Sequence, residues 1–283
     1  MGTSLNGFAV ASGGPFSPPG PAGAARYRSY IWPDPAFLGQ NAGGSGNIGA
    51  RGIASGQITF LTSGFNGGTT PICAIVNSLI GVTLPMTATA GVGIRMQPTI
   101  ADLKTSRNSI PLSADDCRCT RVWANLAAST GCALTQDQGF FMVHPGGVAQ
   151  RIVQDVATGF GFFIGQNNVV SWMVRGPNGL VTTNLTSTAG GFDITKHHTY
   201  EIIMVSSIAN ADAYLFALID SIPQTIPVLS RSWGTGTNLP ANTTVSSISG
   251  FAPEVVADIR SAGTTLHCQQ LGVAFGPTIA SLG

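Results

Sequence analysis

The stretch His198–Ser206, with the sequence HTYEIIMVS, is the clearest β-strand signal in the chain. The spacer Ala209-Asn210-Ala211-Asp212 separates it from a second apolar run, Ala213–Ile222, with the sequence AYLFALIDSI. Two such runs around a short spacer favour a β-hairpin, because Asn and Asp tolerate turn geometry. This hairpin predicts an antiparallel sheet in the C-terminal half of the chain.

Short apolar runs separated by turn signals continue on both sides of the hairpin. We expect further strands at Gly139–His144, Val148–Val156, Gly159–Ile164, Val169–Arg175, Leu180–Asn184 and His267–Phe275. Turns at such short spacing are typical of a sandwich or barrel. Only Ala252–Ser261, with Pro253 near its start and Gly263 beyond its end, is expected to be a helix. The predicted fold class is all-β, a jelly roll or other β-sandwich.

The first 50 residues are predicted to form an extended N-terminal arm. Residues 12–25 are rich in Gly and Pro, which raise the entropic cost of order and remove backbone donors. The arm also carries the aromatic residues Tyr27, Tyr30, Trp32 and Phe37. We expect these to anchor the arm on a neighbouring chain, the alternatives being a disordered tail or an arm folded onto its own domain. Residues 51–110 are expected to form a small β region and residues 111–283 the main sandwich.

The composition is poor in charge. Charged residues make up 9% of the 283 residues, against about 25% in an average soluble protein, and the formal net charge is +1. Without a basic stripe, nucleic-acid binding is not expected. The most apolar stretch, Ile72–Met86, is too short and too interrupted for a membrane span. We expect instead a β protein whose surface is largely covered by partners.

Five cysteines leave at least one without a partner inside the chain: Cys73, Cys117, Cys119, Cys132 and Cys268. The sequence leaves three alternatives: a zinc site formed with His267, a disulfide, or plain buried thiols. The spacing of a metal finger is missing, which disfavours zinc. Buried thiols, which pack like small apolar groups, are favoured. No cofactor is expected.

Recognisable catalytic patterns are missing from the sequence. There are two glutamates, Glu201 and Glu254, and neither lies in a paired-carboxylate pattern. Glu201 is expected to face solvent. His197 and His198 are adjacent, so on a strand they would diverge and not share a metal. The expectation is that the chain is not an enzyme.

Several runs of the sequence resemble the concanavalin-like (laminin-G-like) jelly roll. They are GFFMVH at 139–144, GFGFFIGQNN at 159–168, WMVRGPNGL at 172–180, DITKHHTYEIIMVSS and the closing LGVAFG. The resemblance covers about half of the chain and implies a two-sheet sandwich. Such domains occur in virion proteins of tailed bacteriophages. Members that bind sugars through calcium need Asp and Asn at loop tips, and here Asn210 and Asp212 are explained by the turn alone.

Aromatic residues on the expected strands are predicted to fill the core: Phe140, Phe141, Phe160, Phe162, Phe163, Trp172 and Phe216. Trp233 lies instead in a Gly- and Thr-rich loop. With Asp212, it is the candidate for contact with a glycan or a partner; the alternative is that it caps one end of the core.

The first functional hypothesis is a non-catalytic virion structural protein that decorates the capsid. It would form a homo-oligomer, such as a trimer, and would contact other virion proteins. The second is a tail or baseplate adhesin that binds host-surface glycans. A degradative enzyme on the same fold is the third.

Overall fold

The structure is a computed structural model of the whole chain. It describes residues 28–32, 58–63, 72–85, 92–98, 119–128, 138–143, 159–165, 169–176, 179–185, 192–206, 213–226, 252–259 and 265–276. All regular elements in these segments are strands, which form two sheets. None of the described segments is a helix with the length and apolarity to cross a membrane. The all-β prediction is confirmed.

The first sheet has eight strands and is antiparallel throughout. Its order is β13 (Ile222–Gln224), β12 (Ala213–Ile219), β11 (His198–Ser206), β6 (Cys119–Ala128), β15 (Thr265–Gly276), β4 (Leu79–Pro85) and β3 (Ile72–Val76), and β1 (Arg28–Trp32) also pairs with β15. β11 and β12 pair along their length, from Tyr200 opposite Ile219 to Ser206 opposite Ala213. The predicted central hairpin is therefore present.

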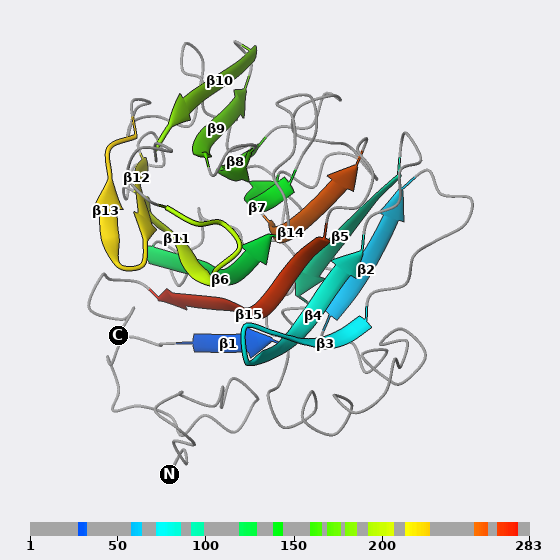
Figure 1. The fold of residues 1–283 in the computed structure, drawn as a ribbon. Helices are drawn as coiled ribbons and strands as arrows, with labels where there is room; N and C mark the ends of the chain where they lie inside the picture. Colours follow the sequence, from blue (N-terminus) through cyan, green and yellow to red (C-terminus); the bar gives the residue numbers. More distant parts are fainter. Residues whose placement is uncertain are drawn as a thin grey trace, which may run out of the picture.

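The second sheet has seven strands. Its order is β10 (Gly179–Asn184), β9 (Val170–Gly176), β8 (Gly159–Ile164), β7 (Gln138–Val143), β14 (Ala252–Ile259), β5 (Val92–Pro98) and β2 (Ile58–Ser63). The two curved sheets pack face to face as a jelly-roll sandwich (Figure 1). Strands from residues 51–110 lie in both sheets: β3 and β4 in the first, β2 and β5 in the second.

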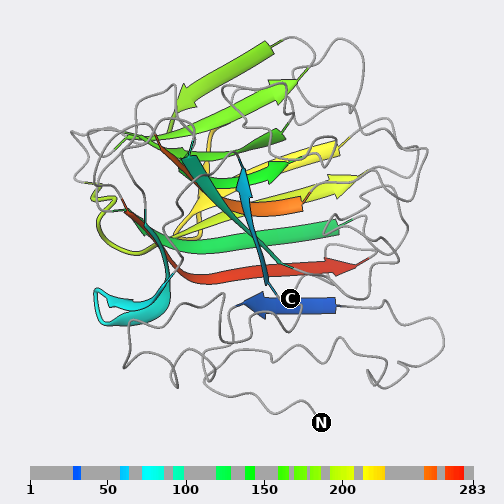
Figure 2. The same ribbon diagram turned by 90° about the vertical axis from the view of Figure 1, so that its right-hand side faces the viewer.

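Strand β1 belongs to the predicted arm and pairs within its own chain. It runs antiparallel to the C-terminal half of β15, with Arg28 opposite Phe275 and Trp32 opposite Leu271. Figure 2 shows β1 in blue along β15 in red. Tyr30 and Trp32 thus lie on a strand of this sheet, whereas Tyr27 and Phe37 fall outside the described residues.

The core is rich in aromatic residues from the seven-stranded sheet. Phe162 of β8 makes an edge contact with Trp172, with ring centroids 5.3 Å apart, and lies 5.4 Å from the ring of Tyr200 on the opposite sheet. The predicted core residues Phe140, Phe141, Phe160, Phe162, Phe163 and Trp172 are all buried. Phe216 is the exception: it is 50% exposed, because on β12 the alternate residues Leu215 and Ala217 face the core.

The expected helix at Ala252–Ser261 is wrong. This segment is β14, paired with β7 over Ala252–Ala257 and with β5 over Val255–Ile259. Pro253, which cannot donate a backbone hydrogen bond, lies where only β7 is paired, so the strand tolerates it. Pairing on both sides outweighs the helical start and stop signals, since the two neighbouring strands satisfy its backbone groups.

Candidate functional site

The polar side chains of the eight-stranded sheet gather on the face that points away from the core. On β6, Val122, Ala124 and Leu126 are in the core, so the alternate residues Arg121, Trp123 and Asn125 lie on the opposite side. We call this side the outer face. Its cross-strand register adds Glu201 and Thr199 of β11 and Gln270 and Gly272 of β15, each opposite a residue of β6.

The Trp123 indole lies against a glycine of the neighbouring strand. A Cβ atom on Gly272 would meet Cε2 and Cζ2 of the Trp123 ring at 2.1 Å, so only a glycine leaves room for this indole. The indole Nε1 donates a hydrogen bond of 3.1 Å to Oε1 of Gln270. The guanidinium carbon of Arg121 lies 5.3 Å from the ring centroid. The indole is therefore fixed in place while remaining partly exposed.

Arg121 and Glu201 form an ion pair beside Trp123. Nη2 of Arg121 donates to Oε2 of Glu201 at 2.8 Å, and the two side chains are 35% and 7% exposed. Glu201 lies on the outer face, as its position between two core residues requires, but the expectation that it faces solvent is wrong. The guanidinium covers it and supplies the countercharge that a buried carboxylate needs.

A β-bulge shapes the other end of the outer face. The register of β15 against β6 shifts between Cys268 and Gln270, so one extra residue separates two side chains that both point outward, His267 and Gln270. The bulge packs on Gly81 of β4, where a Cβ would lie 2.6 Å from Cε1 of His267. Cys268 points into the core as a buried thiol, and this burial raises its pKa. Cys268 and His267 therefore cannot share a zinc ion.

Two histidines and an asparagine form a chain of contacts on the outer face. Nε2 of His267 lies 3.2 Å from the carbonyl oxygen of Ala74, and its Nδ1 lies 3.2 Å from Nε2 of His197. Nδ1 of His197 lies 3.1 Å from Oδ1 of Asn125, whose Nδ2 donates to Oγ1 of Thr199. Burial lowers the pKa of His267 to about 4 and also lowers that of His197. Both rings are therefore neutral at neutral pH.

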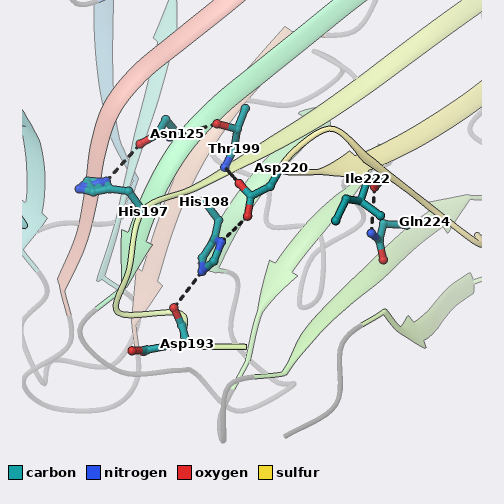
Figure 3. Close-up of polar contacts among 8 residues, drawn as sticks. All are labelled: Asn125, Asp193, His197, His198, Thr199, Asp220, Ile222 and Gln224. Atoms are coloured by element: carbon teal, nitrogen blue, oxygen red, sulfur yellow. Dashed lines mark hydrogen bonds and ion pairs between the residues drawn. The ribbon is translucent and has the colours of Figure 1, made fainter. Parts of the chain in front are cut away.

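His198 points in the other direction, as Figure 3 shows. Its Nδ1 lies 2.6 Å from Oδ2 of Asp220, and its Nε2 lies 3.0 Å from the carbonyl oxygen of Asp193. Phe192 stacks on the ring with centroids 4.0 Å apart. Asp220 and Ser221 both have positive φ, as a two-residue hairpin turn requires, and Oδ1 of Asp220 accepts from the backbone of Thr199. This cluster ties the β12–β13 turn to the start of β11.

The divergence of the two adjacent histidines is confirmed by these contacts. Among the described residues, no three His, Cys, Asp or Glu side chains gather in a way that could hold a metal ion together. The sequence-predicted contact residues Trp233 and Asp212 lie outside the described residues. The structure instead brings Trp123 and Arg121 of β6 together with Gln270 of β15. The sequence did not single out these residues, because the two strands are far apart in the chain.

The chain has the jelly-roll β-sandwich fold. No family model matches the sequence, and no curated protein matches it either. Solved structures that resemble it include lectin-like domains and enzymes. An endo-1,3-β-glucanase from Streptomyces sioyaensis is 13% identical, with a TM-score of 0.46 over 90% of this chain and 99% of that one. A legume lectin-like domain from Entamoeba histolytica is 10% identical, with a TM-score of 0.45 over 87% and 95%.

An alginate lyase from Pseudomonas aeruginosa is also similar, at 10% identity and a TM-score of 0.44 over 68% of this chain and 82% of that one. At these identities the likeness concerns the fold alone. It nevertheless corrects one expectation: the exclusion of enzymes is wrong, because the solved structures that this chain resembles include two enzymes. Missing sequence patterns cannot exclude catalysis, since strands distant in sequence can assemble catalytic groups.

Proposed function

We propose that this protein binds a glycan on the outer face of its eight-stranded sheet. The observation that carries the proposal is the placement of Trp123, whose indole is held against Gly272 and remains partly exposed. A flat aromatic ring offers an apolar surface for the C–H face of a sugar ring. The glycine and the bond to Gln270 hold the indole ready before any ligand arrives, which lowers the entropic cost of binding.

The side chains around the indole suit the hydroxyl groups of a sugar. Nη2 of Arg121 donates to Glu201, and the guanidinium lies over the indole, with its carbon 5.3 Å from the ring centroid, so Nη1 is a donor close to the ring. Because Glu201 neutralises Arg121, the platform presents hydrogen-bonding groups without a large net charge. Polar groups placed around an apolar surface are typical of small-molecule sites, where the polar groups fix orientation.

Substitution of Trp123 tests the proposal. We expect Trp123→Ala to weaken binding to glycans selected on an array by about 2 kcal/mol or more, roughly 30-fold in Kd, the size typical of a central Trp. Calorimetric titration of the best array ligand measures the change. The matched control is Trp233→Ala, which should leave binding unchanged. Binding that depends on Trp233 and not on Trp123 would place the site elsewhere and contradict the proposal.

We also propose that the protein is carried on a virion of a tailed bacteriophage as a homo-oligomer such as a trimer. Support comes from composition: 9% charged residues is low for a free domain and suits a surface covered by partners. Tyr27, Tyr30, Trp32 and Phe37 would help to anchor the arm, and the glycan would be a host-surface one.

Light scattering on the purified chain tests the oligomer. We expect the mass of a stable trimer, and we expect a variant lacking residues 1–27, which keeps β1, to dissociate more readily if the arm contributes contacts. A monomer at all concentrations in both forms would contradict this setting, and would leave the glycan proposal unaffected.

A further inference from the structure

On the outer face, the rings of His197 and His267 each direct one nitrogen toward the other ring. Nε2 of His197 and Nδ1 of His267 are 3.2 Å apart, and the rings meet edge to face with centroids 4.9 Å apart and planes at 80°. The residues come from different places: His197 precedes β11, whereas His267 stands at the bulge of β15. Gly81 makes the space for the second ring.

The far nitrogen of each ring faces an oxygen that accepts hydrogen bonds. Nε2 of His267 faces the carbonyl oxygen of Ala74 at 3.2 Å, and Nδ1 of His197 faces Oδ1 of Asn125 at 3.1 Å. Nδ2 of Asn125 is already directed to Oγ1 of Thr199, which turns Oδ1 toward the histidine. With the Asn125 amide in this orientation, each far nitrogen carries the ring hydrogen.

This arrangement leaves the two near nitrogens without hydrogens. A neutral imidazole carries one N–H, so His197 Nε2 and His267 Nδ1 each present a lone pair to the other. In this tautomer pair the two lone pairs face each other at 3.2 Å, and a cation bound to both would remove their repulsion. A proton and a metal ion are the two candidates for this cation, and the distance between the two nitrogens distinguishes them.

We propose that His197 Nε2 and His267 Nδ1 bind a divalent transition-metal ion, with Zn²⁺ as the reference ion. Two nitrogen ligands of tetrahedral zinc, each about 2.0–2.1 Å from the metal, lie roughly 3.3–3.4 Å apart. The observed separation of 3.2 Å is close to this value. Neutral imidazole is also a preferred ligand of zinc, copper and nickel.

The surroundings of the rings resemble the outer shell of a metal site. Metal-bound histidines almost always donate their other N–H to a carbonyl or carboxylate oxygen, which fixes the tautomer. Ala74 and Asn125 supply such oxygens here. Thr83 lies opposite His267 in the register of β4 and β15 and is 7% exposed. Its Oγ1 is buried and has no hydrogen-bond partner among the residues that the structure describes.

Two histidines are an incomplete ligand set. No third His, Cys, Asp or Glu joins them among the described residues. Water or another exchangeable ligand would complete the coordination of the ion, as in zinc sites that keep an open position. The site does not rest on the proposed glycan function and can be tested without any glycan.

The competing arrangement is a neutral relay in which the Asn125 amide is turned. Its Nδ2 would then donate to His197, His197 Nε2 would donate to His267, and no cation would be needed. The two arrangements differ in what Asn125 must do. An aspartate at this position can accept but not donate, so Asn125→Asp permits the metal site and forbids the relay.

Titration calorimetry of the full chain with ZnCl₂ at pH 7.5 is the test. We expect one saturable site, lost in His197→Gln and in His267→Gln. His198→Gln is the matched control and should bind zinc like the unchanged chain, because His198 faces Asp220 instead. Zinc should also raise the melting temperature of the unchanged chain by mass action, and this rise should vanish in the two ligand variants.

The Asn125 variants separate the alternatives. We expect Asn125→Ala to weaken zinc binding by about 10–100-fold, the usual cost of losing an outer-shell partner, and Asn125→Asp to keep or tighten it. Three results would each overturn the proposal: no saturable zinc binding by the unchanged chain, binding that survives both histidine substitutions, or loss of binding in a folded Asn125→Asp variant.

Discussion

Replacing Phe162 by alanine is expected to lower the free energy of unfolding by about 3–5 kcal/mol, the usual cost of removing a buried phenyl ring. The Phe162 ring is fully buried and contacts Trp172 of its own sheet and Tyr200 of the opposite sheet. Its loss would open a cavity between the two sheets, and the surrounding rings are too rigid to fill it. Chemical denaturation followed by intrinsic fluorescence measures the change.

Phe216→Ala is the matched control for this prediction. The same substitution on the outer side of β12, where the ring is 50% exposed, should change stability by no more than about 0.5 kcal/mol. If both variants lose the same stability, Phe162 does not join the sheets in the way described. A loss confined to Phe162 would confirm that the core lies between the two sheets.

The contrast between these two phenylalanines also shows how far sequence patterns reach. Both stand in runs that predict strands, and the strands are present, because alternation of apolar residues is a local property. Which face of a strand meets the core is decided by the other sheet. In AYLFALI, alternation alone does not say whether Leu215 or Phe216 faces inward, and ring size favoured the wrong answer.

Strand β14 marks the same limit. Pro253 near the start of the segment and Gly263 beyond its end favoured a helix. No residue pattern within the segment indicates that β5 and β7 pair with it on either side. These neighbours come from residues 92–98 and 138–143, far from β14 in sequence. Pairing with distant strands satisfies the backbone hydrogen bonds of a segment, and the local propensities of its residues do not predict that pairing.

The candidate site lay further beyond prediction than the fold. Trp123 could be placed on a strand from the sequence, but its role depends on Gly272 beneath it, on a strand near the other end of the chain. His267 faces outward at a β-bulge, and no residue pattern in the sequence predicts that bulge. Two signals were nevertheless present: the Trp123 ring lies against Gly272 and the His267 ring against Gly81, and glycine within a strand indicates close approach of a neighbour.

The second large effect is expected from a substitution at Gly272, because this glycine makes room for the Trp123 ring. We expect Gly272→Ala to displace the Trp123 indole, because the new methyl group would lie 2.1 Å from two ring atoms. Glycan affinity should fall at least as far as in Trp123→Ala, roughly 30-fold. Stability should fall as well, by about 1–3 kcal/mol, since overpacking forces the ring out of its preferred position. Calorimetric titration and chemical denaturation measure the two effects separately.

A double-mutant cycle decides whether Gly272 acts through Trp123. If the methyl group harms binding only by moving the indole, then Gly272→Ala adds no further loss in a chain that already carries Trp123→Ala. The stability cost should shrink in the same double variant, because the alanine at position 123 leaves space for the methyl group. Additive losses of affinity would instead mean that the backbone at Gly272 contacts the glycan itself. Unchanged affinity in the folded single variant would remove the positioned indole as the basis of recognition.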